Sequence, residues 1–454
     1  MPFPRTTLAA VLALALLPPV VALAADADRI RELERQLAEQ KTLMQQQQRM
    51  LERMEAELQQ LKGATTTPPA PDAMRQAAGK AATGTVAPDH ALDLQLYGHL
   101  QLDAIHDFKR VDPDYEATLR PSTIPTVDGI FGDDGSTLLS VRQSTMGLRG
   151  SADTPAGLVK GWFEFDMFGT GSSTGDTTFN LRHAWVEIGG LGFGQTNSNF
   201  MDIGIFPNVV DWWGPSGMAF NRNPQLRYTW ALGEDEFAVA LEQPNASFNT
   251  GIFGEISPAF DDAATARTEL PDLTARYRLA GHWGHLQLAG VLRRLEFETR
   301  GTPDNEPTFE DTGWGLNVTG AINSIGRDQL KFGLVYGEGI ASFMNDGGVN
   351  LAPENFEEEP VPVLGTTLYY DRYWSGQWSS SIGFSINDAD ARNQQADAEF
   401  DRGIYASANL LYTPYPALLI GLEALYGRHE DVAGRSGEDF RTQVTFKHKF
   451  STHF

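Results

Sequence analysis

Alternation of apolar and polar residues dominates the chain from about residue 92 to its end. In the last stretch one set of alternate positions is largely apolar and includes Val444, Phe446, Phe450 and Phe454, and the other set is polar or basic. A period of two places the two sets on opposite faces of a β-strand. A final strand with one lipid-like face and a terminal aromatic residue is typical of a bacterial outer-membrane barrel, which Phe450 and Phe454 are predicted to close. The alternative is a half-buried strand of a soluble β-sandwich.

The connections between these segments alternate in length. Short turns such as 281–284 and 324–328 separate long loops such as 110–136, 245–268 and 342–360. Short turns at one end and long loops at the other are the plan of an outer-membrane barrel. The fold class predicted is therefore all-β, a transmembrane antiparallel β-barrel of about 16 strands over residues 91–454. The long loops are expected to face outside as solvated surface.

The first 90 residues follow other patterns. Arg5, an apolar run and the Ala22-Leu23-Ala24 site predict a signal peptide over residues 1–24. Heptad spacing then predicts a periplasmic α-helical coiled coil over 25–62, and its core positions are Ile30, Leu33, Leu37, Met44, Leu51, Met54, Leu58 and Leu61. The Pro-, Ala- and Thr-rich stretch 63–90 predicts a linker. A single solvated helix folded back on the barrel is the alternative to self-association.

Composition narrows the possible functions. The chain contains no Cys, which excludes disulfides, thiolate metal sites and Cys nucleophiles. A net charge of -24 argues against nucleic acid as a partner. The nine His residues lie in no convincing motif with a nucleophile or an acid. We therefore expect no enzyme activity, no cofactor and no metal.

Residues 199–223 are unusually apolar and aromatic for a loop. Folded inward against the barrel wall, this segment would narrow the lumen, so it is predicted to be a constriction loop. Its candidate residues are Asp202, Asp211, Trp212, Trp213, Gly214 and Pro215. The alternative is an exposed loop that packs on a neighbouring subunit.

Basic residues outnumber acidic ones on the inferred lumen face. The substrate path is predicted to include Arg149, Lys160, Arg182, Arg227, Arg276, Arg278, Arg293 and Lys331, and the same face carries Arg441, Lys447 and Lys449. The acidic candidates there are Asp103, Glu164, Asp166, Glu187, Glu242 and Glu423. Arginines in a narrow water path favour anions, and their fork suits carboxylates. The alternative is that these cations pair with the acids and only stiffen the wall.

For one predicted strand, the alternation does not decide which side chains face the lumen. Arg182 and Glu187 have opposite parity in LRHAWVEIG. Because successive side chains of a strand point to opposite faces, only one of the two can face the lumen unless the strand contains a bulge.

Several ordered blocks carry a resemblance to a known family. They are LYGHLQLDAIHDF (96–108), SVRQSTMGLRG (140–150), GLVKGWFEFDMFG (157–169), LRHAWVEIG (181–189), GFGQTNSNFMD (192–202) and NPQLRYTW (223–230). In these blocks the chain resembles the DcaP-like family of trimeric porins from the outer membrane of Gram-negative bacteria. The resemblance implies a homotrimer in outer-membrane lipid that passes small anionic solutes, notably dicarboxylates. It makes Arg149, Lys160, Arg182 and Arg227 the first candidates for the anion path.

Two alternative functions remain open at this point. A phosphate-selective porin also begins with a coiled segment, but it needs a dense cluster of Arg and Lys, and the 199–223 loop offers only Arg222. An envelope-tethering barrel would use the coiled coil to reach from the outer membrane towards peptidoglycan, with the pore incidental.

Overall fold

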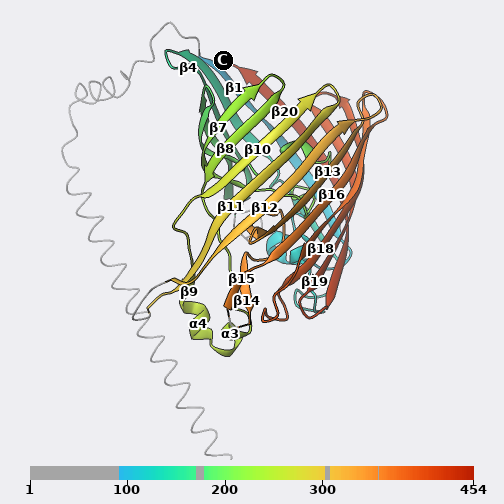
Figure 1. Ribbon diagram of the computed structural model, residues 1–454. Helices are drawn as coiled ribbons and strands as arrows, with labels where there is room; N and C mark the ends of the chain where they lie inside the picture. The colour runs from blue at the N-terminus through green and yellow to red at the C-terminus, as the bar shows by residue number, and fades with distance from the viewer. Residues whose placement is uncertain (1–91, 170–177, 302–306, 356) are drawn as a thin grey trace, which may run out of the picture. The chain divides into compact units, whose positions relative to one another are not determined.

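The computed structural model describes residues 92–169, 178–301, 307–355 and 357–454 (Figure 1). The predicted signal peptide, coiled coil and linker lie outside these residues. The helical elements are short: α3 (Gly251–Ile256), α4 (Pro258–Ala263) and the 3-10 turns η1 (Pro113–Tyr115), η2 (Pro121–Thr123), η3 (Ile203–Ile205) and η4 (Ala341–Phe343). None of the helices in the described ranges is long and apolar enough to cross a membrane.

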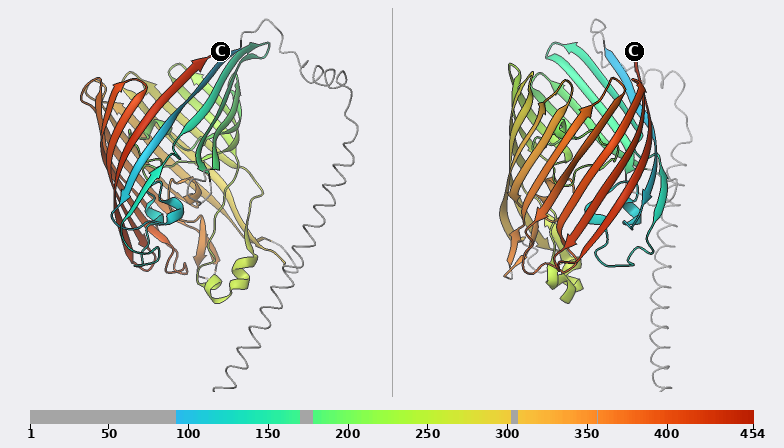
Figure 2. Two further views of the ribbon diagram at one scale, coloured as in Figure 1. Left: turned by 180° about the vertical axis from the view of Figure 1, so that it is seen from behind. Right: turned by 90° about the vertical axis from the view of Figure 1, so that its right-hand side faces the viewer.

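Antiparallel strands form one closed barrel (Figures 1 and 2). Its sheet has 18 strands, but β2 and β3 share the partner β1, and β9 and β10 share the partner β11, so the strands fill 16 positions around the ring. The prediction of an all-β barrel of about 16 strands is confirmed. The strands are β1 (Asp93–Asp107), β2 (Ser136–Ser140), β3 (Thr145–Thr154), β4 (Gly157–Gly169), β5 (Thr178–Ile188), β6 (Leu191–Asn197), β7 (Arg222–Leu232), β8 (Asp235–Glu242), β9 (Ala264–Arg267), β10 (Asp272–Gly281), β11 (Gly284–Thr299), β12 (Pro307–Asn323), β13 (Gln329–Glu338), β16 (Pro362–Tyr373), β17 (Trp378–Ala389), β18 (Phe400–Tyr415), β19 (Leu418–Asp431) and β20 (Ser436–His453).

The first and last strands of the barrel pair with each other. β1 and β20 run antiparallel from Gln95 opposite His453 to Asp107 opposite Arg441. Phe450 lies opposite Gly98, where a Cβ would come within 2.2 Å of a backbone oxygen of β3. Glycine is therefore needed for the close approach of these strands. The Phe454 N–H donates to the Leu94 carbonyl at 2.9 Å, so the last residue extends the same seam.

The two faces of the wall differ as the alternation predicts. In β1, Leu100 is 67% exposed on the outside, whereas Asp103 is fully buried inside. Outer-membrane barrels have short turns on the periplasmic side, so we assign the short-turn end to the periplasm. Figures 1 and 2 show the C-terminus at this end and α3, α4 and a separate hairpin, β14 (Leu351–Glu354) with β15 (Glu357–Pro360), at the opposite end.

Two long loops, in addition to the 199–223 segment described below, bury apolar side chains against the inside of the wall. The loop after β1 buries Val111, Leu119 and Ile124 against Tyr369 and Tyr405 of β16 and β18. The loop after β13 buries Ile340, Phe343 and Met344 together with Phe200, Met201 and the wall residues Ala289, Val291, Val335 and Val363. The expectation that loops 110–136 and 342–360 simply face outside is wrong for these parts, because their apolar side chains are removed from water inside the barrel.

Candidate functional site

Asp202 fastens the 199–223 segment to one wall of the lumen. Its carboxylate lies 3.0 Å from Arg278 Nη1, 2.7 Å from His285 Nε2 and 2.8 Å from Thr319 Oγ1. These partners belong to β10, β11 and β12. Burial by itself raises the pKa of the Asp202 carboxyl, but the contacts with His285 and Arg278 together hold it well below its usual range. The segment is therefore anchored by an ionised side chain.

A second anchor lies on the opposite wall. The N–H groups of Val210 and Asp211 donate to the Glu423 carboxylate of β19 at 3.0 and 2.8 Å. The Asp211 carboxylate accepts hydrogen bonds from Thr118 Oγ1 and the Gly214 N–H, both at 3.0 Å. Burial raises the pKa of Asp211, which these donors counteract. The segment thus crosses the inside of the barrel from one wall to the other.

The aromatic tip of the segment is bonded to the loop after β13. Trp213 Nε1 donates to the Asn345 carbonyl at 2.7 Å, and the Asn345 amide donates back to the carbonyls of Trp213 and Pro215 at 2.8 and 2.9 Å. The Gly217 N–H donates to Ser385 Oγ of β17 at 2.7 Å. The two loops therefore form one hydrogen-bonded unit inside the barrel.

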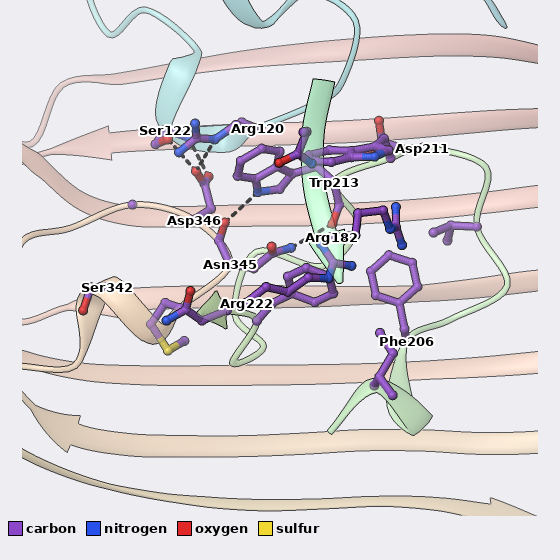
Figure 3. Close-up of a pocket in the computed structure, with 18 of the residues that line it drawn as sticks. Arg120, Ser122, Arg182, Phe206, Asp211, Trp213, Arg222, Ser342, Asn345 and Asp346 are labelled. Atoms are coloured by element: carbon purple, nitrogen blue, oxygen red, sulfur yellow. Dashed lines mark hydrogen bonds and ion pairs between the residues drawn. The ribbon is translucent and has the colours of Figure 1, made fainter. Parts of the chain in front are cut away.

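A cavity of about 840 Å³ opens beside this unit (Figure 3). Four cations line it: Arg120, Arg182, Arg222 and Lys447. Arg120 pairs with Asp346 at 3.0 Å and lies 4.0 Å over the Trp213 ring. Arg222 Nε donates to Asn197 Oδ1 at 3.1 Å. Within the described ranges, neither Arg222 nor Lys447 forms an ion pair.

Trp212 forms part of the lining of the same cavity. Its ring stacks on Phe168 of β4 with centroids 4.1 Å apart, and its Nε1 donates to Asp166 at 3.0 Å. The cavity therefore combines cations with aromatic surface.

Two smaller cavities continue from the first along the inner wall towards the periplasmic end. The next one, of about 520 Å³, shares His99, Thr145 and Arg182 with it and adds Lys449. The last one, of about 310 Å³, shares Arg149 with the second and adds Lys160. The three cavities therefore adjoin one another, and this row of cavities, called the route below, is lined by cations from β3, β4, β5 and β20.

A bulge explains how Arg182 faces this route. The β4–β5 register shifts between Glu164 and Phe165, so Arg182 has no partner in the ladder and projects inward. It lies 2.8 Å from Glu164 and 3.0 Å from Asp166. Because the bulge changes the parity, Glu187 also lines the route. Both residues of the ambiguous strand therefore reach the lumen.

The remaining predicted path residues have acidic partners. On β10, β11 and β13 the ion pairs are Arg276–Glu236 at 3.1 Å, Arg278–Asp202 at 3.0 Å, Arg293–Asp272 at 3.1 Å and Lys331–Asp371 at 2.8 Å. Arg227 lies 3.9 Å from Glu187 and over the Trp185 ring. Of the eight predicted residues, only Arg149 and Lys160 lack an ion pair to the acids that the structure describes.

Sequence reasoning missed Arg120 as a lining residue. It lies in the loop after β1, which was expected to be outside. The signal that could have found it is the apolar character of its neighbours Leu119 and Ile124, which is unusual in a solvated loop.

A closed 16-position barrel with an apolar outer face, a polar lumen and a loop unit crossing that lumen defines a porin of the outer membrane. Comparison with known proteins agrees. A sequence model of the DcaP outer membrane protein family matches residues 26–450, so the chain belongs to that family.

Solved structures share the fold. The crystal structure of the outer membrane channel DcaP of Acinetobacter baumannii aligns with a TM-score of 0.67 at 21% identity, over 79% of this chain and 98% of that chain. The anion-selective porin from Comamonas acidovorans aligns with a TM-score of 0.51 at 12% identity, over 79% of this chain and 100% of that chain. At these identities the similarity describes the fold. No curated protein matches the chain.

Proposed function

We propose that the protein is an anion-preferring porin through which small solutes such as dicarboxylates diffuse across the outer membrane. The observation that carries this proposal is the row of three adjoining cavities whose cations, on one side of the barrel, outnumber the acids that could neutralise them. The 199–223 segment acts in it as the constriction.

The charges at the constriction favour a carboxylate. Arg222 and Lys447 line the largest cavity and have no acidic partner within the described ranges. In a narrow space with protein on several sides, an unpaired cation attracts an anion more strongly than it would in bulk water. The planar fork of Arg222 can hold a carboxylate through two hydrogen bonds, while Lys447 acts as a point charge. A short dicarboxylate can therefore engage two cations along the route at once.

Four cations around one cavity also support the phosphate-selective alternative. Arg120 and Arg182, however, are already paired with Asp346 and with Glu164 and Asp166. This leaves two unpaired cations at the cavity. Two cations suit a carboxylate, whereas phosphate requires a dense cluster of them.

The family further supports a homotrimer, which the mass of the detergent-extracted protein tests.

Liposome swelling tests the solute preference. Proteoliposomes are placed in isotonic succinate, in the dication of a four-carbon diamine, or in a neutral diol of the same length. We expect swelling in succinate to exceed swelling in the diol several-fold and the diamine to be the slowest, since the route attracts one sign of charge and repels the other. Equal rates for the three solutes, or faster entry of the diamine, would contradict the proposal. Phosphate added as a competitor should slow succinate less than glutarate does.

A further inference from the structure

We propose that the periplasmic mouth holds a second binding site, separate from the constriction, for an organic carboxylate with an apolar body, and that Arg149 is its principal ligand. The proposal deepens the proposed function, on which it rests for the sign of the permeating charge. The site is the cavity of about 310 Å³ between β1, β3, β4 and β5.

Arg149 is held by aromatic rings instead of by an acid. Its guanidinium carbon lies 4.6 Å from the centre of the Tyr97 ring and 4.7 Å from that of Trp162. Stacking fixes the plane of the guanidinium group but uses none of its N–H donors. No ion pair to Arg149 occurs among the described acids. The donors therefore remain available to a ligand.

The rings themselves are fixed in place. Trp162 Nε1 donates to Tyr97 Oη at 2.5 Å, and Tyr97 Oη donates to the Glu164 carboxylate at 2.5 Å. Tyr97 also fills the space above Gly147, where a Cβ would lie 2.4 Å from the ring. Trp162 stacks on His183 with centroids 3.5 Å apart. Arg149 is thus preorganised, which lowers the entropic cost of binding an anion.

Lys160 supplies a second charge to the same cavity. It lies on β4 two residues before Trp162, and Trp162 is opposite Arg149 in the β3–β4 ladder. Such diagonal neighbours on one face of an antiparallel pair have their backbones ~7–8 Å apart. A carboxylate placed between them can contact both cations.

The two acids that line the cavity each have a partner other than Arg149 or Lys160, although Glu187 also lies opposite Lys160 in the β4–β5 ladder. Glu187 accepts a hydrogen bond from Trp185 Nε1 at 2.9 Å and lies 3.9 Å from Arg227. Asp93 is exposed and lies 3.6 Å from His453. The indoles of Trp162 and Trp185 contribute to the remaining lining. A carboxylate with an apolar body matches this combination better than a fully hydrated inorganic anion does.

Side-specific block of the ion current tests the site. Benzoate and acetate are added in turn to the periplasmic or the opposite side of a single channel in a planar bilayer. We expect benzoate from the periplasmic side to block with an apparent dissociation constant about fivefold or more below that of acetate. Equal block by the two anions, or benzoate block independent of the side, would overturn the site.

Arg149→Lys separates the site from the general anion preference. It keeps a positive charge but loses the fork held between the two rings, so benzoate block should weaken about fivefold or more, whereas acetate block should weaken less. The matched control is Arg327→Lys, because Arg327 also stacks on a ring, that of Tyr373 at 4.5 Å, but lines none of the three cavities. Unchanged benzoate block in Arg149→Lys would overturn the site and leave the proposed function intact. A cation-preferring wild type would contradict the proposed function alone, and loss of block in Arg149→Lys would still support the site.

Discussion

Two inner walls of the barrel each carry four lumen cations that can be compared. On one wall these cations have no acidic partner among the described residues, and on the other each of them is paired with an acid. On the wall built by β20, β1, β3 and β4, Arg441 pairs with Asp107 at 2.5 Å, but the described acids form no ion pair with Arg149, Lys160, Lys447 or Lys449. On the wall built by β10, β11 and β13, every one of Arg276, Arg278, Arg293 and Lys331 has an acid within 3.1 Å. A paired cation adds little net field to the lumen, whereas an unpaired one acts on passing solutes. We therefore propose that the unpaired cations set selectivity, whereas the paired wall provides the Asp202 anchor of the 199–223 segment.

The largest effect is expected from removing an acid of the paired wall. Asp202→Ala leaves Arg278 and His285 without their partner, and breaking a buried pair in this way costs about 3–5 kcal/mol. We expect the 199–223 segment to lose its fixed position and the single-channel current to become larger and noisier. Hydrogen exchange of backbone amides 200–206 measures the change in local stability.

The matched change on the unpaired wall is Lys449→Ala. No buried partner is left behind there, so the loss of stability should stay within about 0.5 kcal/mol. Equal amide protection in Asp202→Ala and wild type would show that the two walls do not differ in this way.

The next effect concerns selectivity. Neutralising two unpaired cations of β20 in Lys447→Gln/Lys449→Gln should move the reversal potential in a KCl gradient towards the potassium value, because the lumen then keeps its acids and loses free positive charges. The comparison variant, Arg276→Gln/Glu236→Gln, removes a whole ion pair and should leave the potential nearly unchanged. Equal shifts in the two variants would contradict the assignment of selectivity to one wall.

The last prediction is a pH dependence outside both walls, confined to one hairpin. Burial raises the pKa of Glu358, in the β14–β15 hairpin, to about 8. Its native form therefore retains a proton that the unfolded chain loses near pH 4.5, so stability of the hairpin falls as the pH rises from about 4.5 to about 8 and then levels off. Glu358→Gln should remove this slope and protect the hairpin amides more than wild type at pH 8 but not at pH 4. Hydrogen exchange at the two pH values measures this; an identical slope in the variant would exclude Glu358 as its source.

Sequence patterns predicted the barrel well for a physical reason. A period of two determines which side chains face lipid and which face the lumen, so Arg149, Lys160, Arg227 and Arg276 could be placed on the inner face without a structure. Arg182 could not, because its position depends on a bulge that parity does not reveal.

The sequence could not show whether each cation is paired with an acid or packed on an aromatic ring. Arg278 finds its acid 76 residues away in a loop, whereas Arg149 finds two rings. Such partners depend on register and on loops that fold inward, and both are set by tertiary packing. For the same reason Arg120 was missed, since nothing in strand periodicity applies to a loop. The role of the predicted coiled coil stays a prediction.

The most direct measurement is the reversal potential of the wild-type channel in a planar bilayer under a KCl gradient. The unpaired cations of one wall predict a potential on the chloride side of zero, reduced by high salt because screening weakens their field. A potential on the potassium side, at low as well as at high salt, would mean that the lumen carboxylates govern entry and would contradict the account.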